Sequence, residues 1–256
     1  ASSAASDVYK RQVFLDTLFK GNSTNHASYG SVITASSNST NLSITGSTFE
    51  NNTGLEKGAI SNVGTMYITD STFKGNKTTF VNGANISGGG GAIHNTGTAY
   101  ILSSIFDGNT SHTGGAIFNR GGTMEIVDTI FKNNQIIAGS GGDGLNIEGS
   151  AIYNKGGTLK IVGSTFESNS TAGGTIASSS VGNIDIVKSD FLNNTATTLG
   201  AVLYNGRYNI VDSSFHGNSA EKAEHGGGVA AYVTASIVGS DFVSNSTKGS
   251  GGVFHN

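Results

Sequence analysis

Apolar and polar positions follow one order along this chain, and that order recurs nine times. Each copy ends on Phe-x-x-Asn, and the residue five positions before the Phe is Ile in eight copies and Phe14 in the first. The residue six positions before the Phe is variable and mostly polar, whereas its neighbours are apolar in nearly every copy. Such alternation with a period of two predicts a half-buried β-strand in each copy.

The Phe and the Asn of this signature are predicted to form two structural ladders. Their copies lie 24 to 35 residues apart, and stacking the copies about 4.8 Å apart would place Phe on Phe and Asn on Asn. Stacked Asn side chains can hydrogen-bond along the axis and satisfy buried backbone groups. After Phe19 and Asn22 in the first copy, the ladder residues are Phe49, Phe73, Phe106, Phe131, Phe166, Phe191, Phe215 and Phe242, with Asn52, Asn76, Asn109, Asn134, Asn169, Asn194, Asn218 and Asn245.

A second motif, Gly-Ala-Ile and close variants, lies between successive Phe sites. Its distance to the next Phe is nearly constant at 13 to 16 residues, whereas its distance from the preceding Phe varies from 9 to 20. Length variation is therefore confined to one corner of each copy. The three longest insertions, 77–90, 135–149 and 219–227, should project from the same edge, where loops on a rigid scaffold often recognise partners. The alternative is that these insertions have no function and accumulated because this corner accepts changes in length.

These patterns predict an all-β fold, a right-handed parallel β-helix of about nine rungs that is pectate-lyase-like. A single short strand cannot bury its apolar face, but a stack of similar rungs can. The chain has no Pro, which would remove a hydrogen-bond donor from any rung. The Leu-dominated and Trp-Asp signatures of leucine-rich repeats and β-propellers are absent.

One β-helix domain is expected over residues 13–256. Residues 1–12 carry no repeat and are interpreted as an artefactual segment at the edge of a metagenomic reading frame, and the natural protein is expected to be longer.

Composition narrows the function classes. A net charge of −3, with 12% charged residues, gives no nucleic-acid or anionic-membrane footprint. The absence of Cys removes disulfides and thiolate metal sites. No apolar stretch reaches the roughly 18 residues of a membrane span, and no His spacing resembles a metal site. We therefore expect no cofactor, no metal and no membrane span in this chain.

The two motifs together resemble those of the chlamydial polymorphic outer membrane proteins. Gly114-Gly115-Ala116-Ile117 followed by Phe131-Lys132-Asn133-Asn134 is the best match, and the resemblance extends from about Val13 to the end of the chain. In that bacterial family the repeats form the β-helical passenger of an autotransporter that acts as an adhesin. The resemblance thus implies an extracellular or cell-surface structural and adhesive module, whose partner is a host, matrix or carbohydrate ligand.

Two other functions are weighed against adhesion. Polysaccharide-degrading or carbohydrate-binding β-helices use acidic and basic residues from adjacent rungs. Three positions before each Phe, the four acids Asp16, Asp70, Asp128 and Asp212 never occupy neighbouring rungs.

Six positions before the Phe, three successive rungs carry Glu125, Lys160 and Asp185. These three are weak candidates for catalytic residues; the alternative is that they form an ordinary solvent-exposed face. We expect that the chain is not an enzyme. The other function is self-association into filaments, because open rung ends can template further stacking.

Overall fold

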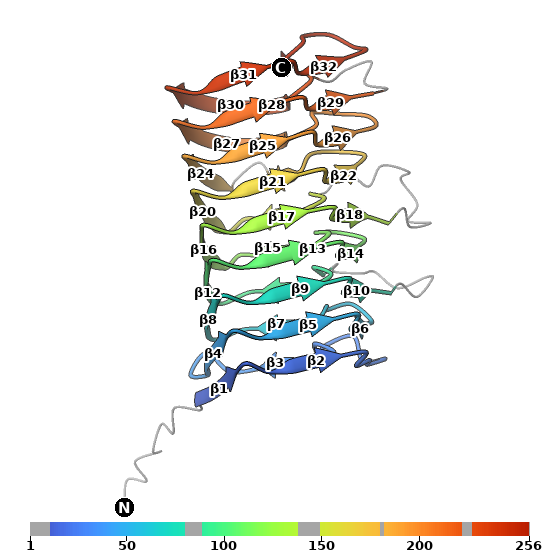
Figure 1. Ribbon diagram of the computed structural model, residues 1–256, viewed down its shortest axis with the longest axis vertical. Coiled ribbons are helices and arrows are strands. Elements are labelled where there is room, and N and C mark those ends of the chain that lie inside the picture. Colours follow the sequence, from blue (N-terminus) through green and yellow to red (C-terminus); the bar gives the residue numbers. More distant parts are fainter. Residues whose placement is uncertain (1–10, 80–88, 138–148, 180–181, 222–226, 256) are drawn as a thin grey trace, which may run out of the picture.

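The chain folds into a stack of short parallel strands, shown in the computed structural model of Figure 1. The structure describes residues 11–79, 89–137, 149–179, 182–221 and 227–255, and over these ranges it contains strands and no helix. Every strand pair is parallel and joins adjacent rungs, so the all-β parallel solenoid is confirmed. Nine stacked strands carry the Phe residues, which corresponds to about eight full turns. Right-handed winding and likeness to pectate lyases stay predictions.

The largest sheet has two arms. One arm holds the five-residue strands that precede each Phe, and the other holds the strands of the Gly-Ala-Ile motif; the two arms meet in β27. The first arm contains β1 (Arg11–Leu15), β4 (Asn41–Thr45), β8 (Thr65–Thr69), β12 (Thr98–Leu102), β16 (Thr123–Val127), β20 (Thr158–Val162), β24 (Asn183–Val187) and β27 (Leu203–Val211). The second contains β3 (Ile33–Ala35), β7 (Ile60–Asn62), β11 (Ile93–Asn95), β15 (Ile117–Arg120), β19 (Ile152–Lys155) and β23 (Ile176–Ser178), and β30 (Ala230–Val238) and β33 (Phe254–His255) follow β27.

Two further sheets close each rung. The Phe sheet contains β2 (Leu18–Lys20), β5 (Thr48–Glu50), β9 (Thr72–Lys74), β13 (Ile105–Asp107), β17 (Ile130–Lys132), β21 (Thr165–Glu167), β25 (Asp190–Leu192), β28 (Ser214–His216) and β31 (Asp241–Val243). The narrow sheet contains β6 (Thr53–Gly54), β10 (Lys77–Thr78), β14 (Thr110–Ser111), β18 (Gln135–Ile136), β22 (Ser170–Thr171), β26 (Thr195–Ala196), β29 (Ser219–Ala220) and β32 (Ser246–Thr247).

The Phe side chains form one continuous stack through the core. Neighbouring ring centroids from Phe19 to Phe242 lie 4.7 to 4.9 Å apart. Between Phe49 and Phe215 every Phe of the stack is fully buried. The Ile column from Ile44 to Ile210 packs beside it in the same cluster. The alternation in sequence thus becomes an inner face of apolar residues, and their burial from water drives the stacking.

The Asn ladder runs beside the Phe stack and is fully buried from Asn52 to Asn218. Asn109 shows its pattern. Its Nδ2 donates to the Phe73 carbonyl (2.9 Å) and to Asn134 Oδ1 (3.1 Å). Its Oδ1 accepts from the backbone N–H and the Nδ2 of Asn76. Each Asn therefore satisfies its own amide and backbone groups of the preceding rung, which is what burial of polar groups requires.

The corner before each Phe is held by a buried Ser or Thr. Ser71 is an example: its Oγ accepts from the Ser47 backbone N–H (3.2 Å) and donates to the Thr69 carbonyl (2.8 Å). The residue just before it, Asp70, has φ 48°. The chain turns sharply here because one residue adopts the left-handed conformation and a hydroxyl replaces the lost backbone contacts.

A second, shorter Asn ladder lies at the ends of the Gly-Ala-Ile strands. Asn62, Asn95, Asn119 and Asn154 are linked by side-chain hydrogen bonds of 2.7 to 2.8 Å. The ladder begins at Asn62 because Ala35 is the partner of Asn62 in the preceding rung. Asn62 Oδ1 is consequently buried with no hydrogen-bond partner among the described residues.

Parts of the sequence interpretation fall outside the described residues. These include residues 1–10 of the non-repeat segment and most of the three long insertions. Arg11 and Gln12, at the end of that segment, belong to β1 and pair with Asn41 and Leu42 of β4.

Replacing Asn109 by Ala should lower the free energy of unfolding by about 3 kcal/mol or more, because four hydrogen bonds are lost and buried partners are left unsatisfied. Urea or guanidinium titration followed by circular dichroism measures the change. Asn41→Ala, on the outer side of β4, is the control and should stay within about 0.5 kcal/mol. Equal effects of the two variants would contradict the ladder's role.

Replacing Ala35 by Asn should stabilise the fold by about 1 kcal/mol, because the new Nδ2 can donate to the orphaned Asn62 Oδ1. Thermal and chemical denaturation measure the gain. Ala35→Val adds volume without a donor and should destabilise. The prediction fails if the Asn variant is no more stable than the Val variant.

Candidate functional site

The outer face of the long strands carries one row of side chains that differs from rung to rung. This central column consists of the middle residues of β4 to β24 and their partners in β27 and β30, which are Ser43, Tyr67, Tyr100, Glu125, Lys160, Asp185, Asn209 and Ser236. The candidate residues Glu125, Lys160 and Asp185 are therefore brought together on consecutive strands.

Within this triplet Lys160 is bonded to Glu125. Its Nζ lies 2.7 Å from Glu125 Oε1. The hydrogen bond and the charge of Glu125, together with the charge of Asp185, raise the pKa of Lys160 above its ordinary value. A lysine that stays protonated cannot act as a general base, and the pair lies in open solvent, where it contributes little stability. The triplet therefore presents an ion pair and a second carboxylate on an exposed surface.

Two tyrosines extend the column toward the N-terminus. The rings of Tyr67 and Tyr100 stack with centroids 5.2 Å apart and an angle of 13° between their planes, and 48% and 40% of these residues is exposed. Because the rings cover one another, each keeps a single free face. They do not form the broad flat platform on which a sugar ring would lie.

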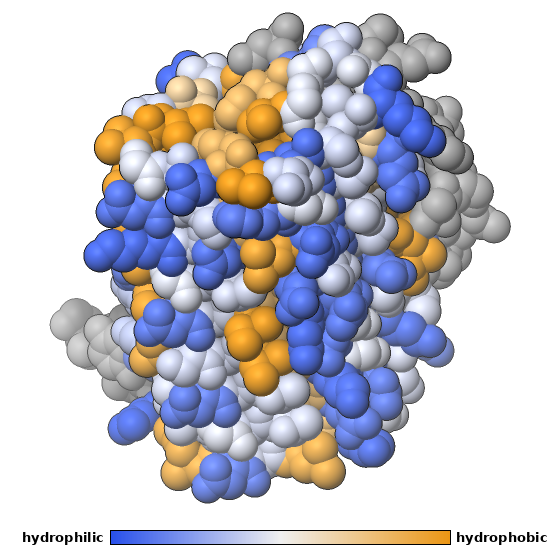
Figure 2. Space-filling model, turned by 45° about the horizontal axis from the view of Figure 1, so that its top comes forward, coloured by the Kyte–Doolittle hydropathy of each residue, from blue (hydrophilic) through white to orange (hydrophobic). Residues whose placement is uncertain are grey.

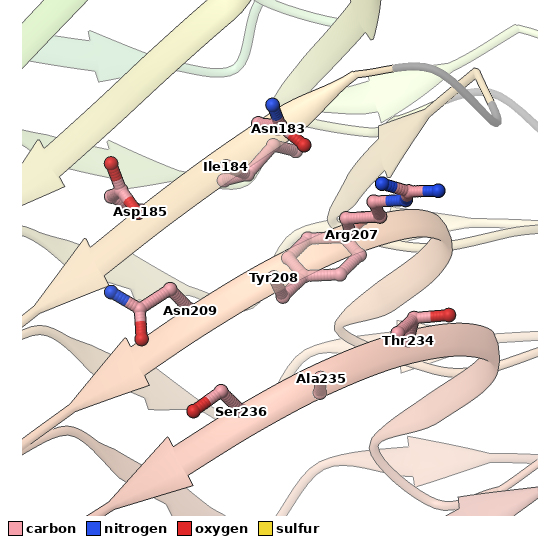
Figure 3. Close-up of a pocket in the computed structure, with 9 residues that line it drawn as sticks. All are labelled: Asn183, Ile184, Asp185, Arg207, Tyr208, Asn209, Thr234, Ala235 and Ser236. Carbon is pink, nitrogen blue, oxygen red and sulfur yellow. The ribbon is translucent and has the colours of Figure 1, made fainter.

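A hollow of about 470 Å³ lies where the column reaches β24, β27 and β30. Figure 3 shows its lining as two rows of polar side chains, with Ile184, Tyr208 and Ala235 between them. One row is Asn183, Arg207 and Thr234, and the other is Asp185, Asn209 and Ser236. We call this hollow the groove.

The groove lies where the regular rung changes shape. In earlier rungs a corner separates the two arms of the large sheet, but β27 and β30 run through that corner as single strands of nine residues. Tyr208 fills the core at this point: its hydroxyl lies within hydrogen-bonding distance of two carbonyls, those of Ile176 (3.3 Å) and Tyr204 (3.2 Å), to which it can donate its one proton. Burial raises the pKa of the Tyr208 phenol. Its neighbour in the next rung, Ala235, is small.

Sequence reasoning did not find Asn183, Arg207, Thr234 or Ser236 as site residues. Counting back from each Phe would have placed them on the correct rows. Nothing in the local sequence signals the hollow itself, because it depends on how three successive strands curve together.

The acids three positions before each Phe have a conformational role. Asp16, Asp70, Asp128 and Asp212 have φ between 47° and 51°, where Asp and Gly are favoured over most residues. A Cβ on Gly163 would lie 2.4 Å from Asp128 Oδ1, and the same contact relates Gly239 to Asp212. At these rungs the Asp carboxylate occupies the space that a Cβ at the same position of the next rung would need, so the next rung has Gly there.

Hydrophilic residues cover most of the face in Figure 2, and hydrophobic ones gather near its top, at the C-terminal end. The exposed Tyr232, Val238 and Val243 belong to the last rungs. Among the described residues, no group of His, Asp and Glu could hold a metal ion. None of the described segments forms a helix long and apolar enough to cross a membrane.

Residues 70–96 and 103–120 match the family model of the Chlamydia polymorphic membrane protein repeat. These two segments are similar to the repeats of that family, and the parallel β-solenoid fits the resemblance. The two matched segments contain Phe73 with Asn76 and Phe106 with Asn109, each followed by a Gly-Ala-Ile strand. Polymorphic membrane protein repeats in a parallel β-solenoid fit a surface-associated module. No curated protein and no solved structure matches the chain significantly.

The repeat residues with positive φ provide a test of the conformational role of the acids. Gly163→Ala should lower the free energy of unfolding by about 2 kcal/mol or more, through the strained φ and the contact with Asp128. In an Asp128→Gly background the same change should cost only about 1 kcal/mol, and denaturant titration of this double-mutant cycle measures the difference.

Gly108→Ala is the matched control, because its φ is +63° and a Cβ there would meet nothing within 4 Å. It should cost about 1 kcal/mol in either background. Absence of coupling between positions 128 and 163 would refute this explanation of the acids.

Proposed function

We propose that this chain is a rigid adhesive module of a bacterial cell surface, whose inner residues build a scaffold and whose outer residues bind a host, matrix or carbohydrate partner. The proposal rests on one observation: the repeated motif residues lie inside the solenoid, whereas the residues that vary lie on its outer face. The Phe, Asn and Gly-Ala-Ile residues of the two segments that match the repeat family are buried. The central column, in contrast, changes from rung to rung.

This division suits recognition because the strands hold outward side chains at fixed positions with little freedom to move. A site preorganised on strands loses less conformational entropy on binding than one on loops. Variation in the outer columns can change the partner without disturbing the stack, since these side chains contribute little to the core.

Binding is favoured over turnover at the triplet. Catalysis by paired carboxylates requires groups whose pKa values are pushed apart, usually in a site that excludes water. Lys160 and Glu125 instead neutralise one another on an open surface. We therefore propose that Glu125, Lys160 and Asp185 contact a partner and do not cleave it.

Beads coated with the whole chain should adhere saturably to at least one of cultured epithelial cells, fibronectin, collagen and laminin. Soluble chain should compete, because the same surface is occupied, and albumin-coated beads measure the background. Adhesion is scored by microscopy. Background adhesion on every surface would refute the adhesive function.

The control for turnover uses the same preparation on pectin, alginate and glycosaminoglycans. No new reducing ends or unsaturated products should appear over prolonged incubation. Product release that is lost on Glu125→Gln would overturn the assignment of the triplet to binding.

A further inference from the structure

The groove on β24, β27 and β30 has the chemistry of a site for hydroxyl groups. Two amides (Asn183, Asn209), two hydroxyls (Thr234, Ser236), one carboxylate and one guanidinium line it. Amides and hydroxyls both donate and accept, whereas the carboxylate only accepts and the guanidinium only donates. A ligand with many hydroxyl groups can pair with all of them.

The two charged groups of the groove are available to a ligand. Within the described ranges, the ion pairs are Lys20–Glu50, Lys132–Asp107 and Lys160–Glu125, so neither Asp185 nor Arg207 is in one. Carboxylates and guanidinium groups form the strongest and most directional hydrogen bonds, and each can contact two neighbouring hydroxyls at once.

Charge balance separates neutral from anionic ligands. Asp185 and Arg207 cancel in the groove, and Glu125 and Lys160 cancel in the adjoining rungs. The surface therefore offers no net positive field to attract a polyanion. A neutral ligand does not need one.

The repeat of the scaffold matches a chain of sugars. The rows run along the solenoid axis, and successive rungs lie 4.7 to 4.9 Å apart at the Phe stack. This spacing is close to the length of one pyranose unit in an extended polysaccharide. Consecutive sugars would meet the same pair of rows, once per rung.

The floor holds the rows in place. Ile184 and Tyr208 are buried in the core, whereas Ala235, in the last of the three strands, is exposed. The hydroxyl of Tyr208 lies within hydrogen-bonding distance of the carbonyl of Ile176 in the preceding rung. The four polar side chains on β24 and β27 therefore stand on strands whose inward residues are buried. Little reorganisation is needed when a ligand binds.

We propose that the groove binds a neutral oligosaccharide, with about three sugar units lying along β24, β27 and β30. This assignment rests on the proposed adhesive function and names the class of its ligand. Asp185, Asn209 and Arg207 would bind sugar hydroxyls on neighbouring rungs, and Asn183, Thr234 and Ser236 would complete the two rows.

Isothermal titration of the whole chain with cellohexaose, laminarihexaose, mannohexaose and xylohexaose tests the proposal, with a heparin hexasaccharide as the polyanion. At least one neutral hexasaccharide should bind saturably and with the same affinity at low and high salt, because the interaction is not between net charges. The double variant Asp185→Ala/Arg207→Ala should weaken that binding about tenfold to a hundredfold.

The matched control is Asp107→Ala/Arg120→Ala, which removes the same residue types outside the groove and should bind like the natural chain. Circular dichroism and melting curves verify that both variants fold. The proposal is overturned if no neutral hexasaccharide binds, if only heparin binds, or if the groove variant binds as tightly as the control.

Running the bead assay on the same preparations separates this inference from the adhesive function. Adhesion without oligosaccharide binding would refute the groove assignment alone. Oligosaccharide binding without adhesion would support the groove and refute the adhesive function.

Discussion

Parallel hydrogen bonding between rungs is the constraint on which the rest of this structure depends. It sets each residue directly above its counterpart, less than 5 Å away, as the Phe stack shows. A column can therefore be uniform only if its side chain is compatible with a copy of itself. Phe stacks on Phe, Ile packs on Ile, and Asn both donates to and accepts from Asn, so these residues fill the inner columns.

Charged residues cannot form a uniform column, because each would repel its copy in the next rung. The structure shows how they are accommodated. On the outer face of the Phe sheet, Lys20, Glu50, Lys74, Asp107, Lys132 and Glu167 occupy consecutive strands and alternate in sign. Two of these neighbouring pairs form ion pairs. Like charges at this separation repel, so alternation keeps the stack in register. Where Asp occupies a left-handed corner, the Gly that follows in three of four cases leaves room for its carboxylate.

The same constraint explains why function belongs on the outer columns. The Phe and Asn columns cannot vary without cavities or unsatisfied amides, whereas outer positions only need to avoid repulsion. Tyrosines, an ion pair, a second carboxylate, one amide and hydroxyls can occur together in the central column for this reason. At the groove the backbone also differs from the earlier rungs, because β27 and β30 continue as single strands through the position of a corner.

The sequence alone determined the solenoid, its ladders and the meeting of Glu125, Lys160 and Asp185 on adjacent strands. It could do so because the register follows from counting residues back from each Phe. The sequence did not reveal that the acids three positions before each Phe adopt a left-handed backbone conformation, because an Asp at a turn cannot be distinguished from an Asp in a functional site by residue type alone. Among the described residues, only the tertiary structure decided where the surface is hollow and which charged side chains form ion pairs. The hollow depends on the curvature of neighbouring strands and on the packing of Tyr208 beside Ala235. Neither can be deduced from the sequence of one repeat.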